Sequence, residues 1–364
     1  KQYLIDMYGE DYVLQNGLKV TTTLDYKLQE KAETVAKNFA PRLASDYGAS
    51  NTAMVAIDPR NGDVIMMVGS KDYFDKEIDG NFNIITAYRQ PGSTMKPFVY
   101  AAAFNKGYTP ETILFDVKTE FSSECTPESK LKNPKSTTAK CYSPENYDNL
   151  YEGPMTMKFA LAQSRNIPAV KTLYLAGIKD SITLANEMGL ESLNDPERYG
   201  LTLVLGGGEV SPLEITSGYG VFANDGIKNK PRIVLRVEDT TGKVLEQAQE
   251  TPERVLSENT ARQISDILSD KKVRIDSLTN LLNGVPREVA IKTGTTNDYR
   301  DVWVIGYTPS FVLTAWAGNN NNSPMERKVA GLIIAPVWTA LFADIASSLP
   351  NDYFKKPEPT PRDT

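Results

Sequence analysis

Three short apolar segments near the C-terminal end of this 364-residue chain constrain its fold more than any other feature. Residues 289–295, 302–307 and 311–317 are rich in valine, isoleucine and aromatic side chains, and only short turn segments separate them. Segments of this length and composition are typical of β-strands, and short turns join strands that run antiparallel. The sequence therefore predicts three antiparallel strands in hairpin succession, with residues 292–295 at one edge.

A second pair of strand-like segments lies far upstream. Residues 54–57 and 64–68 flank the turn sequence DPRNGD, and this pattern predicts another hairpin. We expect this hairpin to join the three later strands. The resulting fold class is α+β, with a five-stranded antiparallel sheet that helices from residues 93–200 and 257–283 cover.

Composition and periodicity divide the chain into three parts. Residues 1–50 are predicted to hold a linker and a helix at 25–42, whose spacing of polar and apolar residues indicates packing on the main body. Residues 51–348 form the main domain, with an accessory hairpin at about 231–247. The tail 349–364 is rich in proline and charge and is predicted to be disordered.

Ser93 and Lys96 are the first candidate catalytic residues. The chain contains no histidine, which excludes every serine hydrolase that uses imidazole as its base. Ser93 follows the turn sequence RQPG and precedes an apolar helix, so Lys96 is expected on the same helix face. Burial and a second positive charge would favour the neutral lysine that can act as a base. The plainer alternative is a helix cap beside a surface lysine.

The pattern Ser-x-x-Lys also occurs at Ser129 and Ser269. The first lies in a segment rich in Lys, Ser, Thr and Pro, and the second in a charged segment. We therefore expect both serines to belong to the solvated surface.

Two more polar motifs follow along the chain. Ser164 and Asn166 come at the end of a helical segment, 155–163, where both side chains could reach a cleft. The alternative is that they are ordinary polar residues at a helix end. The segment 292–295, KTGT, is predicted to be a strand whose glycine lets a ligand or another backbone come close. The triple glycine at 206–208 is interpreted as a tight turn near this site.

Together these motifs resemble the transpeptidase domain of penicillin-binding proteins. The segments that carry the resemblance are RQPGSTMK (89–96), LVLGGGEVSPLEITSGYGVFANDG (203–226) and KTGTTNDYRDVWVIGYTP (292–309). Residues 17–25 resemble the linker between the glycosyltransferase and transpeptidase domains of class A, bifunctional members. The resemblance covers residues 1–345 and implies the fold shared by penicillin-binding proteins and serine β-lactamases, with residues 51–348 as the transpeptidase domain.

The resemblance implies a role for each catalytic residue. Ser93 would be acylated, and Lys96 would be its general base. Ser164 and Asn166 would relay a proton and bind a substrate amide. Lys292 would adjust the electrostatics of the site. Arg165, between Ser164 and Asn166, is given no role.

The resemblance also implies substrate-binding residues. Thr293 and Thr295 would bind the terminal carboxylate of the substrate, next to Gly294 in the same strand. The backbone N–H groups of Ser93 and Thr295 would form the oxyanion hole.

The implied reaction is D,D-transpeptidation of peptidoglycan. Ser93 would attack a stem peptide that ends in D-Ala-D-Ala, release the last D-alanine and pass the acyl group to an acceptor amine. β-Lactam antibiotics would form a long-lived acyl-enzyme. Two alternatives remain open: a D,D-carboxypeptidase or serine β-lactamase that uses water as acceptor, and a non-catalytic sensor or scaffold.

The expected partners and location follow from the same resemblance. Stem peptides and β-lactams are the expected ligands, with proteins of a cell-wall synthesis complex as further partners. The protein is expected to be extracytoplasmic and bound to the membrane only through an anchor upstream of Lys1. A net charge of −6 and a pI near 5.1 give no support to nucleic-acid binding.

The sequence supports no metal or cofactor. Without histidine, and with only Cys125 and Cys141, the usual four-ligand zinc site cannot be assembled. In an extracytoplasmic protein we expect these two cysteines to form a disulfide. The alternative is a pair of free thiols in the loop 118–149.

Overall fold

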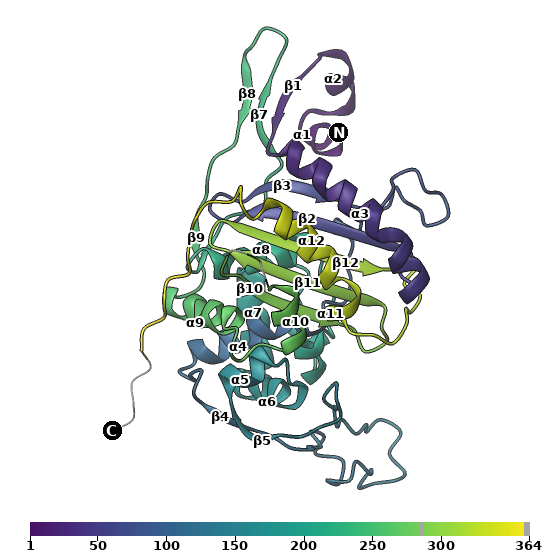
Figure 1. Ribbon diagram of the computed structural model, residues 1–364, viewed down its shortest axis with the longest axis vertical. Coiled ribbons are helices and arrows are strands. Elements are labelled where there is room, and N and C mark those ends of the chain that lie inside the picture. The colour runs from purple at the N-terminus through teal and green to yellow at the C-terminus, as the bar shows by residue number, and fades with distance from the viewer. Residues whose placement is uncertain (284, 286, 360–364) are drawn as a thin grey trace.

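One five-stranded antiparallel sheet organises the protein (Figure 1). The computed structural model describes residues 1–283, 285 and 287–359. The strand order β10-β11-β12-β2-β3 confirms the predicted α+β architecture, since the upstream hairpin joins the three later strands through the pairing of β12 with β2. The strands are β2 (Asn51–Asp58), β3 (Asp63–Val68), β10 (Ala290–Thr295), β11 (Asp301–Thr308) and β12 (Phe311–Gly318).

Both faces of this sheet are buried, because alternate side chains of the central strands enter two separate cores. Trp303 and Ile305 of β11 enter one core, whereas Val302 and Val304 enter the other. Helices therefore have to cover the sheet on both sides. This explains why β11 and β12 are apolar along their length rather than alternating.

The residues of the first two candidate motifs lie on and between the helices that cover the first face. Here α8 packs on β2, β11 and β12, and α9 packs on β10. Helix α4 packs in turn on α6, α7 and α9. The α-helices of this side are α4 (Lys96–Asn105), α5 (Met157–Ala162), α6 (Asn166–Ala176), α7 (Ile178–Glu187), α8 (Pro212–Ala223) and α9 (Glu258–Ser269). The 3₁₀ helices are η1 (Ile84–Thr86), η2 (Gly92–Met95), η3 (Pro196–Arg198) and η4 (Leu201–Leu205).

The second face is covered by helices from the two ends of the chain. They are α3 (Tyr26–Tyr47), α10 (Asp276–Leu281), α11 (Ala330–Ile333) and α12 (Ala335–Ile345). Helix α3 begins where predicted, with Asp25 as its cap, but runs five residues past residue 42, to Tyr47. Gly48 then ends it with a left-handed φ of 67°. Among the described residues, no helix is long and apolar enough to cross a membrane.

The accessory hairpin forms from β7 (Val234–Glu238) and β8 (Val244–Gln247), within the expected range. Strand β1 (Lys19–Thr22) pairs with β7, so the linker contributes a third strand that the sequence did not indicate. Figure 1 shows this small sheet at one end of the long axis and the β4–β5 connection at the other. The remaining elements are α1 (Gln2–Tyr8), α2 (Glu10–Gln15), β4 (Ile113–Asp116), β5 (Gly153–Thr156), β6 (Ile227–Lys228) and β9 (Glu253–Arg254).

The described part of the C-terminal tail lies on the protein body. Phe354 is buried, and its ring contacts that of Tyr307 at a centroid distance of 5.5 Å. Lys355 pairs with Asp225 at 2.7 Å. The sequence predicted disorder for 349–364, and residues 360–364 of this range lie outside the described residues. For the described part the difference comes from one aromatic side chain that fills a site on the main core.

Candidate active site

The first and third motifs meet through close contact between backbones. Gly92, at the start of η2, has a φ of 56°, and a Cβ built there would lie 2.7 Å from the carbonyl oxygen of Thr295. A Cβ on Gly294 would collide with the carbonyl oxygen of Pro91, and one on Gly206 with the backbone of Gly92. The prediction that Gly294 marks a close backbone approach is therefore confirmed. These glycines allow Ser93 to lie beside the end of β10.

Lys96 is the first residue of α4 and is fully buried. Its Nζ donates to the carbonyl oxygens of Ser164 at 2.6 Å and Arg165 at 3.2 Å, and to Oδ1 of Asn166 at 2.8 Å. The lysine of the first motif is thus held by all three residues of the second.

Ser164 connects the two lysines of the site. Its Oγ accepts a hydrogen bond from Lys292 at 2.8 Å and lies 3.4 Å from Nζ of Lys96. The residue has a φ of 56°, rare for a residue with a side chain, and lies between α5 and α6. The prediction that Ser164 and Asn166 end one helix is therefore wrong for Asn166, which begins α6.

Burial lowers the pKa of both lysines, and neighbouring charge adds to this effect at Lys96. Burial is the largest cause that holds the pKa of Lys96 well below its usual value, and the charges of Lys292 and Arg165 act in the same direction. Burial alone lowers the pKa of Lys292 to about 7. The carbonyl and amide oxygens around Lys96 oppose this shift, because they stabilise the ammonium form, but desolvation dominates.

Ser93 is half-buried, and its hydroxyl has no hydrogen-bond partner among residues 1–283, 285 and 287–359. Strand alternation places Thr293 and Thr295 on the face of β10 opposite Lys292. The Thr295 hydroxyl accepts from the backbone N–H of Ala330 at 3.0 Å, and the carbonyl of Thr293 accepts from Lys292 at 2.9 Å. Since β10 is the edge strand of the sheet, both threonines lie along an open edge.

The sequence missed Arg165, the middle residue of the second motif. Its guanidinium is buried and pairs with the fully buried Asp116 at 2.8 Å and with Asp148 at 2.7 Å. Neither carboxylate belongs to a motif, and both lie far from Arg165 in the sequence. Only the fold brings these carboxylates to the guanidinium of Arg165, the residue between Ser164 and Asn166.

The other two Ser-x-x-Lys matches lie elsewhere. Ser269 ends α9 and is buried, so its assignment to the solvated surface was wrong. The cause is the amphipathic packing of α9, which turns this residue towards the core despite its charged neighbours. Ser129 lies half-buried in the loop that carries the cysteines.

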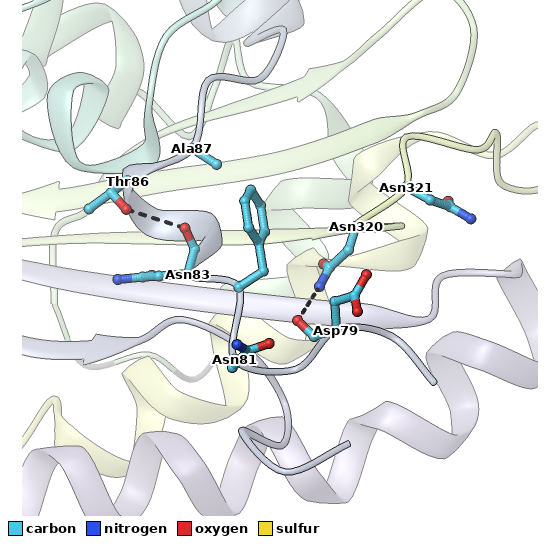
Figure 2. A pocket seen from close by; sticks show the side chains of 8 residues that line it. Asp79, Asn81, Asn83, Thr86, Ala87, Asn320 and Asn321 are labelled. Carbon is cyan, nitrogen blue, oxygen red and sulfur yellow. Dashed lines mark hydrogen bonds between the residues drawn. The ribbon is translucent and has the colours of Figure 1, made fainter. Parts of the chain in front are cut away.

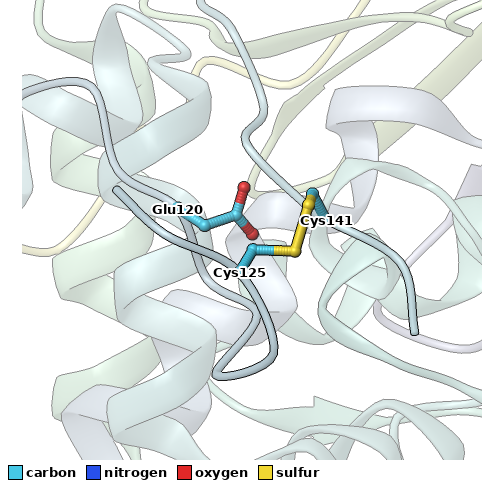
Figure 3. A group of neighbouring side chains, drawn as sticks. All are labelled: Glu120, Cys125 and Cys141. Atoms are coloured by element: carbon cyan, nitrogen blue, oxygen red, sulfur yellow. A yellow bond between two sulfur atoms is a disulfide. The ribbon is translucent and has the colours of Figure 1, made fainter. Parts of the chain in front are cut away.

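Cys125 and Cys141 form a disulfide (Figure 3). The carboxylate of Glu120 lies beside them, within 4.8 Å of the sulfurs. Because both sulfurs are in the disulfide, neither is available as a thiolate ligand for a metal.

A cavity of about 640 Å³ is lined by residues outside the three motifs (Figure 2). The loops around Asp79 and Asn320 form it, and Asn320 donates to the carbonyl oxygen of Asp79 at 3.2 Å. Its lining is mainly polar: Asp79, Asn81, Phe82, Asn83, Thr86, Ala87, Asn320 and Asn321. None of the candidate catalytic residues contributes to this lining.

Comparison with known proteins identifies a family. Residues 52–337 match the model of the penicillin binding protein transpeptidase domain. Penicillin-binding protein 2D of Bacillus subtilis (strain 168) is 31% identical over 351 residues, covering 94% of this chain and 47% of that protein. Penicillin-binding protein 1A of Aquifex aeolicus (strain VF5) is 30% identical, covering 84% of this chain and 39% of that protein. The chain therefore spans less than half the length of these curated relatives.

Solved structures agree on the fold. Penicillin-binding protein 1A from Haemophilus influenzae superimposes with a TM-score of 0.83 at 21% identity, over 98% of this chain and 70% of that one. The PonA1 protein from Mycobacterium tuberculosis in complex with penicillin V superimposes with a TM-score of 0.80 at 22% identity, over 98% of this chain and 94% of that one.

Proposed function

The chain belongs to the penicillin-binding protein transpeptidase family, and we propose that Ser93 is the nucleophile with which it cross-links peptidoglycan. One observation carries this proposal. The hydroxyl of Ser164 lies between Lys96 and Lys292, beside the junction that joins the Ser93 turn to β10. Three motifs scattered over 200 residues thus supply a nucleophile, a base and a proton relay in one place.

The acylation step begins with proton transfer from Ser93 to a neutral Lys96. A neutral amine has two N–H donors and one lone pair, so Lys96 can keep two of its present acceptors while the lone pair faces Ser93. The Ser93 oxygen then attacks the carbonyl carbon of the penultimate D-alanine. The backbone N–H groups of Ser93 and Thr295 are the proposed donors to the oxyanion that forms.

Collapse of the tetrahedral intermediate breaks the peptide bond to the last D-alanine. The departing amine takes up a proton that Lys96 passes through the Ser164 hydroxyl, and free D-alanine leaves. An acceptor amine then attacks the Ser93 ester, which forms the new amide and returns the proton to Ser93. The amide of Asn166 and the hydroxyls of Thr293 and Thr295, next to Gly294, are proposed to bind the stem peptide.

A β-lactam carries a strained amide that Ser93 can attack in the same way. Because the amine stays tethered after its ring opens, the acyl-enzyme persists. Hydrolytic relatives share the acylation step and differ only in the acceptor, so the lifetime of the acyl-enzyme separates the two reactions.

The whole protein is proposed to contain more than this domain. Its curated relatives are more than twice as long as the matched segment, and residues 17–25 resemble the linker of class A enzymes. We propose an upstream membrane anchor and glycosyltransferase domain, an extracytoplasmic location, and contacts with other cell-wall synthesis proteins. The Cys125–Cys141 disulfide supports an oxidising compartment.

Intact-mass measurement after incubation with a fluorescent penicillin tests the function. We expect one adduct on the wild-type protein and none on Ser93→Ala, with an adduct lifetime of hours. An adduct that disappears within seconds would instead indicate a β-lactamase. Absence of any adduct on the wild type would contradict the proposal.

A further inference from the structure

A side chain from outside the three motifs caps the helix that carries the second one. Oδ1 of Asn146 accepts from the backbone N–H of Asn166 at 2.8 Å and of Ile167 at 3.4 Å. These are the first two residues of α6, and the side chain of Arg165, the N-cap residue, makes no hydrogen bond to the backbone of this helix end. The backbone N–H groups at this helix end therefore find their acceptor in a side chain that lies 20 residues upstream.

Buried partners fix the orientation of this cap. Nδ2 of Asn146 donates to Oδ1 of Asp116 at 2.8 Å and to the carbonyl oxygen of Leu150, also at 2.8 Å. The other oxygen of Asp116 accepts from Nε of Arg165 at 2.9 Å. Asn146, Asp116 and Arg165 are 2%, 0% and 1% exposed, so each depends on the others for its hydrogen bonds.

This chain of buried groups ends at the atoms that hold Lys96. The carbonyl of Glu145 accepts from Nδ2 of Asn166 at 2.7 Å, which directs Oδ1 of Asn166 towards Lys96. The carbonyls of Ser164 and Arg165, which also accept from Lys96, belong to the segment that the Arg165 side chain anchors. The left-handed backbone of Ser164 needs such support, because surrounding contacts must hold an uncommon conformation in place.

The segment that supplies Asn146 is itself tied down. The Cys125–Cys141 disulfide closes a loop that ends just before Asn146 (Figure 3). The carboxylate of Glu120 accepts from the backbone N–H of Tyr142 at 2.6 Å. The segment that packs against the second motif is thus constrained on its N-terminal side.

We propose that Asn146 and the Asp116–Arg165 ion pair are positioning residues for acylation, which hold Ser164 and Asn166 in place around Lys96. This inference rests on the proposed function of Ser93 and Lys96. The three residues act through the second motif and are not proposed to touch the substrate.

Arg165 has a second effect on the same base. Its positive charge and that of Lys292 on β10 both disfavour protonation of Lys96. Among the described residues, three carboxylates pair with Arg165 and moderate this effect: Asp116 at the end of β4, Asp148 in the loop that leads to β5, and Glu152 just before β5. Position and charge therefore act together on Lys96.

The first test measures the second-order rate constant of acylation by the fluorescent penicillin for Asn146→Ala and Arg165→Lys. We expect a fall of at least about tenfold for both, since small displacements of reacting groups reduce rates strongly. Asp25→Ala is the matched control, because Asp25 also caps a helix, α3, but on the other face of the sheet. It is expected to acylate within about twofold of wild type despite losing a cap of similar strength.

The second test follows the acylation rate against pH in the double variant Asp116→Asn/Arg165→Met. It removes both charges of the fully buried pair, and the other two carboxylates that contact Arg165, those of Asp148 and Glu152, stay partly exposed to water. Loss of the positive neighbour raises the pKa of Lys96, so the acid limb of the profile should move to higher pH. Arg165→Lys keeps the charge and should leave the limb in place while the rate falls, a separation that general loss of packing would not produce.

The outcomes separate this inference from the function on which it rests. If wild type forms the adduct, Ser93→Ala does not, and Asn146→Ala acylates at the wild-type rate, then the function stands and the positioning role is overturned. If the acid limb of the pH profile stays at the same pH in the double variant, the proposed effect of the Arg165 charge on Lys96 is overturned. If wild type forms no adduct, both proposals fail.

Discussion

Two halves of the candidate active site are held together by different physics. The Ser93 turn meets β10 through bare backbone, at Gly92 and Gly294, with no room for a methyl group. The second motif instead rests on polar side chains, the buried ion pair of Asp116 and Arg165 and the cap from Asn146. The backbone contact at Gly92 and Gly294 tolerates no added atom, whereas a network of hydrogen bonds can lose single bonds and keep the rest. The first half should therefore respond to mutation abruptly and the second gradually.

Lys96 is where the halves join, so its removal should have the largest effect. We expect Lys96→Ala to lower the acylation rate at least about a thousandfold, because both the base and the link between the motifs are lost. The thermal midpoint should change little, because relief of the desolvation cost of a buried amine offsets the loss of a donor to three acceptors in residues 164–166. Stopped-flow acylation and calorimetry check the two parts. Acylation at the wild-type rate would remove Lys96 as the base.

Gly92→Ala tests the steric half. A Cβ 2.7 Å from the carbonyl oxygen of Thr295 must displace the turn, and a displacement near 1 Å can cost about a hundredfold in rate. Gly107→Ala is the matched control, because Gly107 also has a positive φ, 95°, but a Cβ there meets no atom within 4 Å. Both variants bear the left-handed backbone cost, and only Gly92→Ala should lose acylation. Equal loss in both would show that backbone strain, and not the close contact, is responsible.

Lys292 contacts the Ser164 hydroxyl from β10 and so belongs to both halves. Lys292→Met tests its protonation state through the pH dependence of the free energy of unfolding. The pKa of Lys292 is lowered to about 7 in the folded protein, and is about 10.4 in an unfolded chain. Between these values the unfolded chain binds a proton that the folded protein lacks, so the free energy of unfolding should rise with pH. The contribution is at most about 1.4 kcal/mol per pH unit, a tenfold change in the folding equilibrium.

In Lys292→Met this contribution to the slope should disappear. Urea unfolding at pH 7, 8 and 9 would show the variant gaining stability relative to wild type at the lower end, with the difference closing as pH rises. Parallel curves for the two proteins would mean that Lys292 stays protonated in the folded state.

The disulfide should have the smallest effect on the chemistry. In Cys125→Ser/Cys141→Ser we expect acylation within about threefold of wild type, because Asn146 and Asp148 keep their own buried partners. The free energy of unfolding should fall by about 2–3 kcal/mol, as for other short loops released from a disulfide. Intact mass without reduction checks the bond, and urea unfolding checks the stability. A tenfold loss of acylation would make the loop part of the active site.

The sequence predicted most of the sheet and much of the site because the relevant signals are local. Strand-like apolar segments and short turns predicted the hairpins. The three-residue spacing predicted that Ser93 and Lys96 lie about one helical turn apart, and the structure has them on η2 and at the start of α4, which follows directly. The same local reasoning failed at Ser269, whose charged neighbours suggested exposure although α9 buries it. It also could not pair β1 with β7, since those strands lie more than 200 residues apart.

What the sequence determined by itself was therefore the set of elements and the chemical groups that they carry. The tertiary structure alone decided that the hydroxyl of Ser164 accepts from Lys292, 128 residues away, and that Asn146 caps α6. It also decided the low basicity of Lys96, because desolvation depends on which distant segments cover a group. Local patterns record the preferences of the backbone, whereas burial and charge pairing arise only when remote parts of the chain pack together.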